Sequence, residues 1–168
     1  MPGHWEGDLI KGAGNRSSVG TLVERTSRKV VLVKLADAKA ETARDGFAAG
    51  LLAVPAPLRL TLTYGKEMAR HRELAALTGL RVYFADPHAP WQRGSNENTN
   101  GLLRQYLPKG TDLSVFSQAE LDAIATRLNS RPRKTLGFAT PDEVFSALVD
   151  KAANAVTPRN AEGVRYGT

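Results

Sequence analysis

The beginning of the chain alternates between apolar and polar side chains with the period of a β-strand. Glu6 and Asp8 occupy polar positions of one such segment, so both acids are expected on the same strand face. The run 30–33 is continuously apolar, which is typical of a strand buried on both faces. Short links favour an antiparallel meander of three strands, predicted at residues 5–10, 18–25 and 29–35.

Farther along, the apolar period changes to that of a helix. Ala40, Ala43, Phe47 and Leu51 form a stripe that predicts a helix over residues 39–53. Strands and helices follow in turn, some with clear end signals, such as a capping box and a proline at the first helical position. We predict strands at 60–64 and 81–85, and helices at 66–78, from Ser95 to before Pro108, after Ser117, and from Thr140 to about Val149.

This order of elements, βββ-α-β-α-β-α-α-α, predicts an α/β fold of the ribonuclease-H-like kind, with a mixed five-stranded sheet flanked by helices. A generic mixed α/β domain is the alternative. In the ribonuclease-H-like topology the first and fourth strands lie side by side. We expect one domain over residues 3–150 and a loose C-terminal tail over residues 151–168.

The composition indicates which kinds of partner and which cellular compartment are compatible with the chain. The net charge is +6 over 168 residues, which favours a polyanionic partner. Cysteine is absent, which excludes disulfides and thiolate metal sites and is compatible with a cytoplasmic location. The N-terminus lacks the pattern of a signal peptide, and no apolar run approaches the ~20 residues needed to span a bilayer, so no membrane association is expected.

One stretch, residues 88–101, combines a loop with the start of a helix. Ser95 is the expected N-cap, and Glu97 lies in the first turn among asparagines. Trp91 and Arg93 stand just before it. An acid in this setting suits a metal and a phosphate. The alternative is a capped surface helix whose glutamate only complements the helix dipole.

In the predicted topology, acids at three places could converge: Asp8, the end of the fourth strand, and Glu97. Clustered carboxylates repel one another unless a cation neutralises them. Carboxylate oxygens without histidine or cysteine favour Mg²⁺ or Mn²⁺. Two such ions can bind the attacking and leaving oxygens of a phosphodiester.

Six motifs follow one another along the chain, at residues 3–10, 21–25, 61–64, 83–87, 90–101 and 129–133. In this order they resemble the catalytic core of the insertion-sequence-thirty family of transposases, Asp-Asp-Glu recombinases related to retroviral integrases. The resemblance implies DNA cleavage and strand transfer with two Mg²⁺ or Mn²⁺ ions, and it implies that Asp8 is the first metal-binding acid and Glu97 the last.

The chain departs from the family pattern in two places. The family follows its Thr-Leu-Thr-(Tyr or Trp) segment with Asp-x-Gly-Lys-Glu, whereas this chain passes directly from Tyr64 to Gly65. The second catalytic aspartate is therefore missing, and Glu67 either favours a helix N-terminus or replaces the lost ligand. The N-terminal helix-turn-helix region of the family is also absent, so we expect a fragment truncated at its N-terminus or a separately started frame.

Basic and polar side chains of the second half are candidates for DNA contact. Trp91 is either a packing anchor or a base-stacking platform. The cluster of basic residues between 127 and 134 has no acid among them and is either a DNA surface or a solvated basic face. The candidate DNA-binding residues are Trp91, Arg93, Asn100, Arg104, Lys109, Arg127, Arg131, Arg133 and Lys134.

These observations leave several hypotheses. The first is a transposase core acting on transposon ends and target DNA, impaired by the missing aspartate. The second is a catalytically dead module that binds DNA or pairs with intact transposase. The third is a degenerate fragment without a role, and a ribonuclease H enzyme is a further relative. The resemblance also implies a homo-oligomer or pairing with an intact copy.

Overall fold

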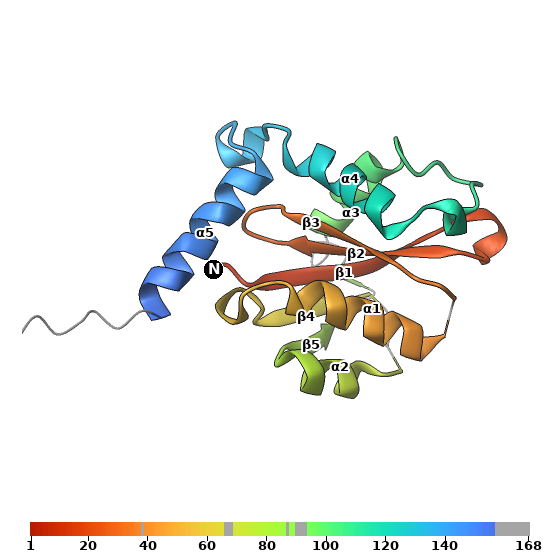
Figure 1. Cartoon of the computed structure of the whole chain (residues 1–168), viewed down its shortest axis with the longest axis horizontal. Helices are drawn as coiled ribbons and strands as arrows, with labels where there is room; N and C mark the ends of the chain where they lie inside the picture. The colour runs from red at the N-terminus through yellow and green to blue at the C-terminus, as the bar shows by residue number, and fades with distance from the viewer. Residues whose placement is uncertain (38, 66–68, 87, 90–93, 157–168) are drawn as a thin grey trace, which may run out of the picture.

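The computed structural model describes residues 1–37, 39–65, 69–86, 88–89 and 94–156. They form a single five-stranded sheet with helices on both faces (Figure 1). The strands are β1 His4–Lys11, β2 Ser18–Glu24, β3 Val30–Lys34, β4 Thr61–Tyr64 and β5 Arg81–Phe84. The α-helices are α1 Ala40–Leu52, α2 His71–Thr78, α3 Gly94–Leu103, α4 Gln118–Asn129 and α5 Pro141–Val156. Short 3-10 helices are η1 Ala13–Asn15, η2 Ala56–Leu58, η4 Leu113–Val115 and η5 Lys134–Leu136.

The strands lie in the order β3-β2-β1-β4-β5. The first three pair antiparallel, because short turns join them, while β4 pairs parallel with both β1 and β5. The predicted mixed five-stranded sheet is thus confirmed, and so is the adjacency of the first and fourth strands.

Each face of the sheet has its own hydrophobic core. On one face α1 and α2 cover Trp5, Leu22 and Leu62, and on the other α3 and α4 cover Ile10, Val23 and Leu32 (Figure 1). This division follows from the alternation along each strand, which sends neighbouring side chains to opposite faces. Asp8 shares its face with Ile10, so it points to the α3 side.

Helix α4 closes the outer edge of β3 through two side-chain amides. Asn129 accepts from the Val30 N–H (2.9 Å) and donates to the Val30 carbonyl (2.9 Å). Farther along β3, Gln118 donates to the Leu32 carbonyl (2.8 Å) and accepts from the Lys34 N–H (2.8 Å). The two amides replace the partner strand that an edge strand lacks.

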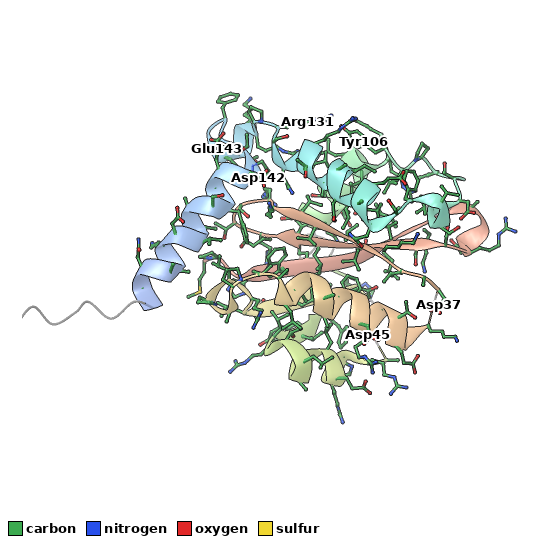
Figure 2. The ribbon with its side chains drawn as sticks, viewed as in Figure 1. Asp37, Asp45, Tyr106, Arg131, Asp142 and Glu143 are labelled. Atoms are coloured by element: carbon green, nitrogen blue, oxygen red, sulfur yellow. The ribbon has the colours of Figure 1, made fainter. Side chains whose placement is uncertain are left out.

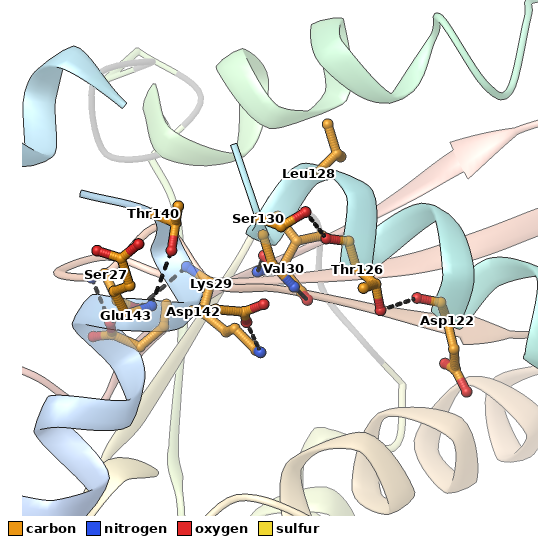
Figure 3. Close-up of polar contacts among 12 residues, drawn as sticks. Ser27, Lys29, Val30, Asp122, Thr126, Leu128, Ser130, Thr140, Asp142 and Glu143 are labelled. Atoms are coloured by element: carbon orange, nitrogen blue, oxygen red, sulfur yellow. Dashed lines mark hydrogen bonds and ion pairs between the residues drawn. The ribbon is translucent and has the colours of Figure 1, made fainter. Parts of the chain in front are cut away.

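Helix α5 is held at its first turn against the β2–β3 turn. Figure 2 labels Asp142 and Glu143 in the first turn of α5, and Figure 3 shows their contacts. The Glu143 N–H donates to Thr140 Oγ1 (3.1 Å), and Lys29 forms an ion pair with Asp142. Phe145 then meets the edge of the Trp5 ring, with centroids 6.1 Å apart. These contacts join the last helix to the first strand.

Several element boundaries differ from the prediction. Helix α3 is Gly94–Leu103, so Ser95 lies inside the helix instead of at its N-cap, and the helix ends before a turn at residues 104–106 rather than just before Pro108. Helix α2 begins at His71, and residues 69–70 form a turn, so the predicted start at residue 66 is too early. Helix α5 continues to Val156 rather than ending near Val149, because Ala152 still packs against the core. The first residues of the predicted tail are therefore helical. Glu67, Trp91 and Arg93 lie outside the described residues, as do residues 157–168.

Candidate functional site

Asp8 lies in the second half of β1 and is half-buried beneath α3. Its Oδ2 accepts a hydrogen bond from Asn100 Nδ2 (3.0 Å), and its Oδ1 accepts from the Leu9 N–H (2.8 Å). The contact with Asn100 fixes which side of α3 faces the acid. Asn100, a candidate DNA-binding residue, is thus engaged with Asp8 in this structure.

The end of β4 lies beside Asp8. In the parallel pairing Tyr64 stands opposite Gly7. Gly65 directly follows Tyr64, and Asp8 directly follows Gly7, so Gly65 lies beside Asp8. The approach is close, because a Cβ on Gly7 would lie 3.0 Å from Leu62 Cδ1 and 3.1 Å from Tyr64 Cδ2. The position next to Asp8 is therefore held by a glycine, which supplies no carboxylate.

Helix α3 is attached to the sheet by polar contacts rather than by an apolar stripe alone. The buried Asn96 donates its N–H to Glu6 Oε2 (2.7 Å), and its Oδ1 accepts from Thr21 Oγ1 (3.2 Å). Together with Asn100, these bonds hold the helix face opposite β1. Two of the asparagines around Glu97, Asn96 and Asn100, therefore hold α3 against the sheet.

Glu97 itself is exposed, in the first turn of α3. Residues three apart on a helix are neighbours, so Glu97 is adjacent to Asn100, the residue that bonds Asp8. The helix face that carries Glu97 therefore borders the β1 acid. Two of the three expected acid positions are occupied, by Asp8 and Glu97.

Glu6, two residues before Asp8 on the same strand face, is buried with 1% of its surface exposed. Burial raises the pKa of its carboxyl above the ordinary value, while the Asn96 N–H and the positive charge of Arg25 act in the opposite direction. The Arg25 Nε lies 3.3 Å from Glu6 Oε1. Glu6 is thus a docking group for α3 and is more deeply buried than Asp8.

In the part of the chain that the structure describes, which does not include Glu67, the donor set does not fit a pair of metal ions. Among the residues that the structure describes, no three histidine, cysteine or acidic side chains form a group that could hold a metal. Asp8 and Glu97 come from facing elements, but Gly65, at the end of β4, contributes no side-chain oxygen.

The predicted DNA-binding residues that the structure describes lie on α3, on α4 and in the segments that follow these helices. Arg104 is half-buried and donates to the carbonyls of Lys11 and Leu107. Arg131 stacks over Tyr106, 5.7 Å from the ring centre, and also contacts its hydroxyl. Both residues are labelled in Figure 2. Exposed on this part of the chain are Lys109, Arg127, Arg131 and Lys134.

Arg133 differs from these, because it is half-buried and turns toward α3. It lines a cavity together with Arg25 and Arg28 of the β2–β3 turn. Sequence reasoning did not select these two arginines as site residues. Their one signal was a pair of cations bracketing a predicted turn, which is common on protein surfaces.

Comparison with solved structures defines the class of fold. The catalytic core domain of BIV integrase matches with a TM-score of 0.67, over 91% of this chain and 99% of that chain, at 16% identity. A chain of the simian T-cell lymphotropic virus intasome in complex with PP2A regulatory subunit B56 gamma matches with a TM-score of 0.58, over 77% and 49%. The fold is therefore that of retroviral integrase catalytic cores, which is ribonuclease-H-like.

Sequence relatives show which proteins the chain is similar to. The chain is 68% identical over 151 residues to the transposase for insertion sequence element IS1086 of Cupriavidus metallidurans, and 51% identical over 153 residues to transposase InsI for IS30A of Escherichia coli. These alignments cover 89% and 88% of this chain but only 44% and 40% of the relatives. No family model matches. The chain is homologous to the IS30-family transposases, which confirms the resemblance in its motifs, and it spans less than half the length of these relatives.

Within the described ranges, no helix combines the length and apolar character needed to cross a bilayer.

Proposed function

We propose that this chain is the catalytic-core part of a DNA transposase whose strand cleavage and transfer are impaired. The homology to transposases and the integrase-like fold support the DNA substrate. The observation that carries the impairment is the β1–β4 register, which sets Gly65 beside Asp8. In the family pattern an aspartate follows this strand, and here it is missing.

The physical argument concerns ligand number. Two-metal transfer of a phosphodiester needs carboxylates that hold both ions at once. With Asp8 and Glu97 alone, the protein lacks one ligand, and catalytic geometry must hold to within about 0.5 Å. We therefore expect the fold to persist while cleavage and strand transfer fall strongly. Loops tolerate length changes, so the short β4–α2 connection leaves the sheet intact.

A strand-transfer assay with Mn²⁺ tests this proposal. It compares the chain with a version carrying Asp-Gln inserted between Tyr64 and Gly65, both fused to the same DNA-binding domain. Activity restored by the insertion supports the proposal, and equal activity of the two proteins overturns it. A third protein, with the insertion and Asp8→Asn, should again be inactive, which ties the restored activity to the β1 acid.

The second candidate function is that of a DNA-binding or transposase-pairing module without catalysis. The net charge of +6 and the exposed Arg127, Arg131 and Lys134 favour it. Mixing the chain with an intact transposase distinguishes the possibilities. Inhibition of strand transfer at equal DNA concentration indicates pairing, whereas competition relieved by excess DNA indicates binding to DNA alone.

A further inference from the structure

A charged cavity lies on the α3 side of the sheet, apart from Asp8 and Glu97. Its volume is about 460 Å³, and it lies between the β2–β3 turn, the start of α3 and the η5 segment. Three guanidinium groups line it, those of Arg25, Arg28 and Arg133, with the carboxylate of Glu6 and the side chain of Thr135. The arginines come from two separate segments, so the fold itself brings their charges together.

Charge within this cavity is unbalanced. Glu6 is the single acid in the lining, and Arg25 already pairs with it at 3.3 Å. The Asn96 N–H, in the first turn of α3, also donates to Glu6. The Glu6 carboxylate thus already neutralises part of the positive charge at the helix N-terminus. The positive charges of Arg28 and Arg133 are therefore not balanced by any acid in the cavity lining.

Arg133 carries the clearest sign of an absent partner. Its Nε is buried and has no hydrogen-bond partner among the described residues, and Nη2 reaches only the Leu128 carbonyl at 3.3 Å. No carboxylate in the described ranges forms an ion pair with it. Burial and the nearby Arg131 both lower the pKa of Arg133. A buried cation is costly unless an anion compensates it.

We infer that this cavity binds a phosphate group of the DNA backbone. A planar guanidinium group can donate two parallel hydrogen bonds to the oxygens of a phosphate. A cavity lined by three arginines and one acid offers such donors from several sides. Helix α3 presents Ser95, Asn98 and Thr99 to the cavity. At 100° per residue, Glu97 and Asn100 fall on the opposite flank of α3 from the three residues that line the cavity. A strand crossing the start of α3 would contact both.

This inference rests on the proposed function, because it takes DNA as the source of the phosphate. The experiment measures binding of a short duplex to the whole chain by fluorescence anisotropy at several salt concentrations. The variants are Arg28→Gln and Arg133→Gln. Arg72→Gln, an exposed arginine of α2 on the other face of the sheet, is the control with the same charge change. Thermal melting confirms that each variant is folded.

Loss of one phosphate contact lowers the slope of log affinity against log salt by about 0.9. We expect this reduction for Arg28→Gln and Arg133→Gln and an unchanged slope for Arg72→Gln. Equal slopes in all three variants overturn the inference while leaving the proposed DNA function standing. Absence of DNA binding by the unmodified chain overturns both.

A second arm separates DNA from free phosphate. Inorganic phosphate is added at constant ionic strength, and the midpoint of thermal unfolding is compared with that in chloride. A phosphate-dependent increase that Arg133→Gln abolishes, together with the change in salt slope, supports a backbone phosphate in the cavity. The same increase with unchanged DNA slopes assigns the cavity to free phosphate and overturns the DNA assignment.

Discussion

Among single residues, the two acids of β1 show how one strand face can hold groups of different character. Glu6 and Asp8 point the same way, but Glu6 is covered by the start of α3, whereas Asp8 is half-buried beside Asn100. The strand pattern predicts their common face. Their unequal burial depends on where α3 docks, which is decided by residues more than 80 positions away along the chain.

The raised pKa of Glu6 makes a prediction for stability. A folded-state pKa above the unfolded value favours folding at low pH, and this contribution disappears as the pH rises through the folded pKa. Glu6→Gln removes the titration while keeping an acceptor for the Asn96 N–H. The free energy of unfolding of the unmodified chain, minus that of the variant, should therefore decrease as the pH rises from about 4 to 7.

Urea unfolding at several pH values measures this difference. Glu143→Gln is a suitable control, because Glu143 lies on α5, away from the Glu6 pocket. A difference for Glu6→Gln that is constant, or that grows with pH, contradicts the prediction.

At the level of elements, the chain uses side-chain amides where another strand would otherwise be needed. Asn129 is buried and binds both backbone groups of Val30, whereas Gln118 is exposed and binds Leu32 and Lys34. The Asn129 position belongs to a motif that resembles the transposase family. In the structure this residue connects α4 to the edge of the sheet.

The two amides should differ in their contribution to stability. Asn129→Leu leaves a buried donor and acceptor of Val30 unpaired, at about 1–3 kcal/mol for each group. Gln118→Leu removes one exposed and one part-buried hydrogen bond, so its cost should be smaller than that of Asn129→Leu. Urea unfolding of the two variants makes the comparison, and an equal loss in both would show that burial does not set the cost.

For the whole molecule, the net charge of +6 and the exposed basic residues of the α3–α4 side predict electrostatic, weakly sequence-specific DNA binding. Phosphate contacts supply affinity, and base contacts supply specificity. Log affinity should fall linearly with log salt, by about 0.9 per neutralised phosphate. Anisotropy with several unrelated duplexes measures this. Affinity that does not change with salt, or strong preference for one duplex, would be inconsistent with it.

Much of the fold could be predicted from the sequence, because strand alternation and helix end signals are local. The Ser117 capping box is an example, since Ser117 and Glu120 bond each other's backbone as the pattern indicates. The start of α2 could not, because helix propensity continues through residues 69–70, where the structure has a turn. The cavity of Arg25, Arg28 and Arg133 could not either, since it depends on contacts between distant segments.

The amide contacts along β3 also bear on how copies of the chain can polymerise. Open sheet edges recruit strands from other molecules, and this is a common beginning of aggregation. Here Val30, Leu32 and Lys34 already have partners at one edge. The opposite edge belongs to β5, which is four residues long, below the usual strand length of about 5–6 residues. Growth by strand addition is therefore blocked at one end of the sheet and has only a short template at the other.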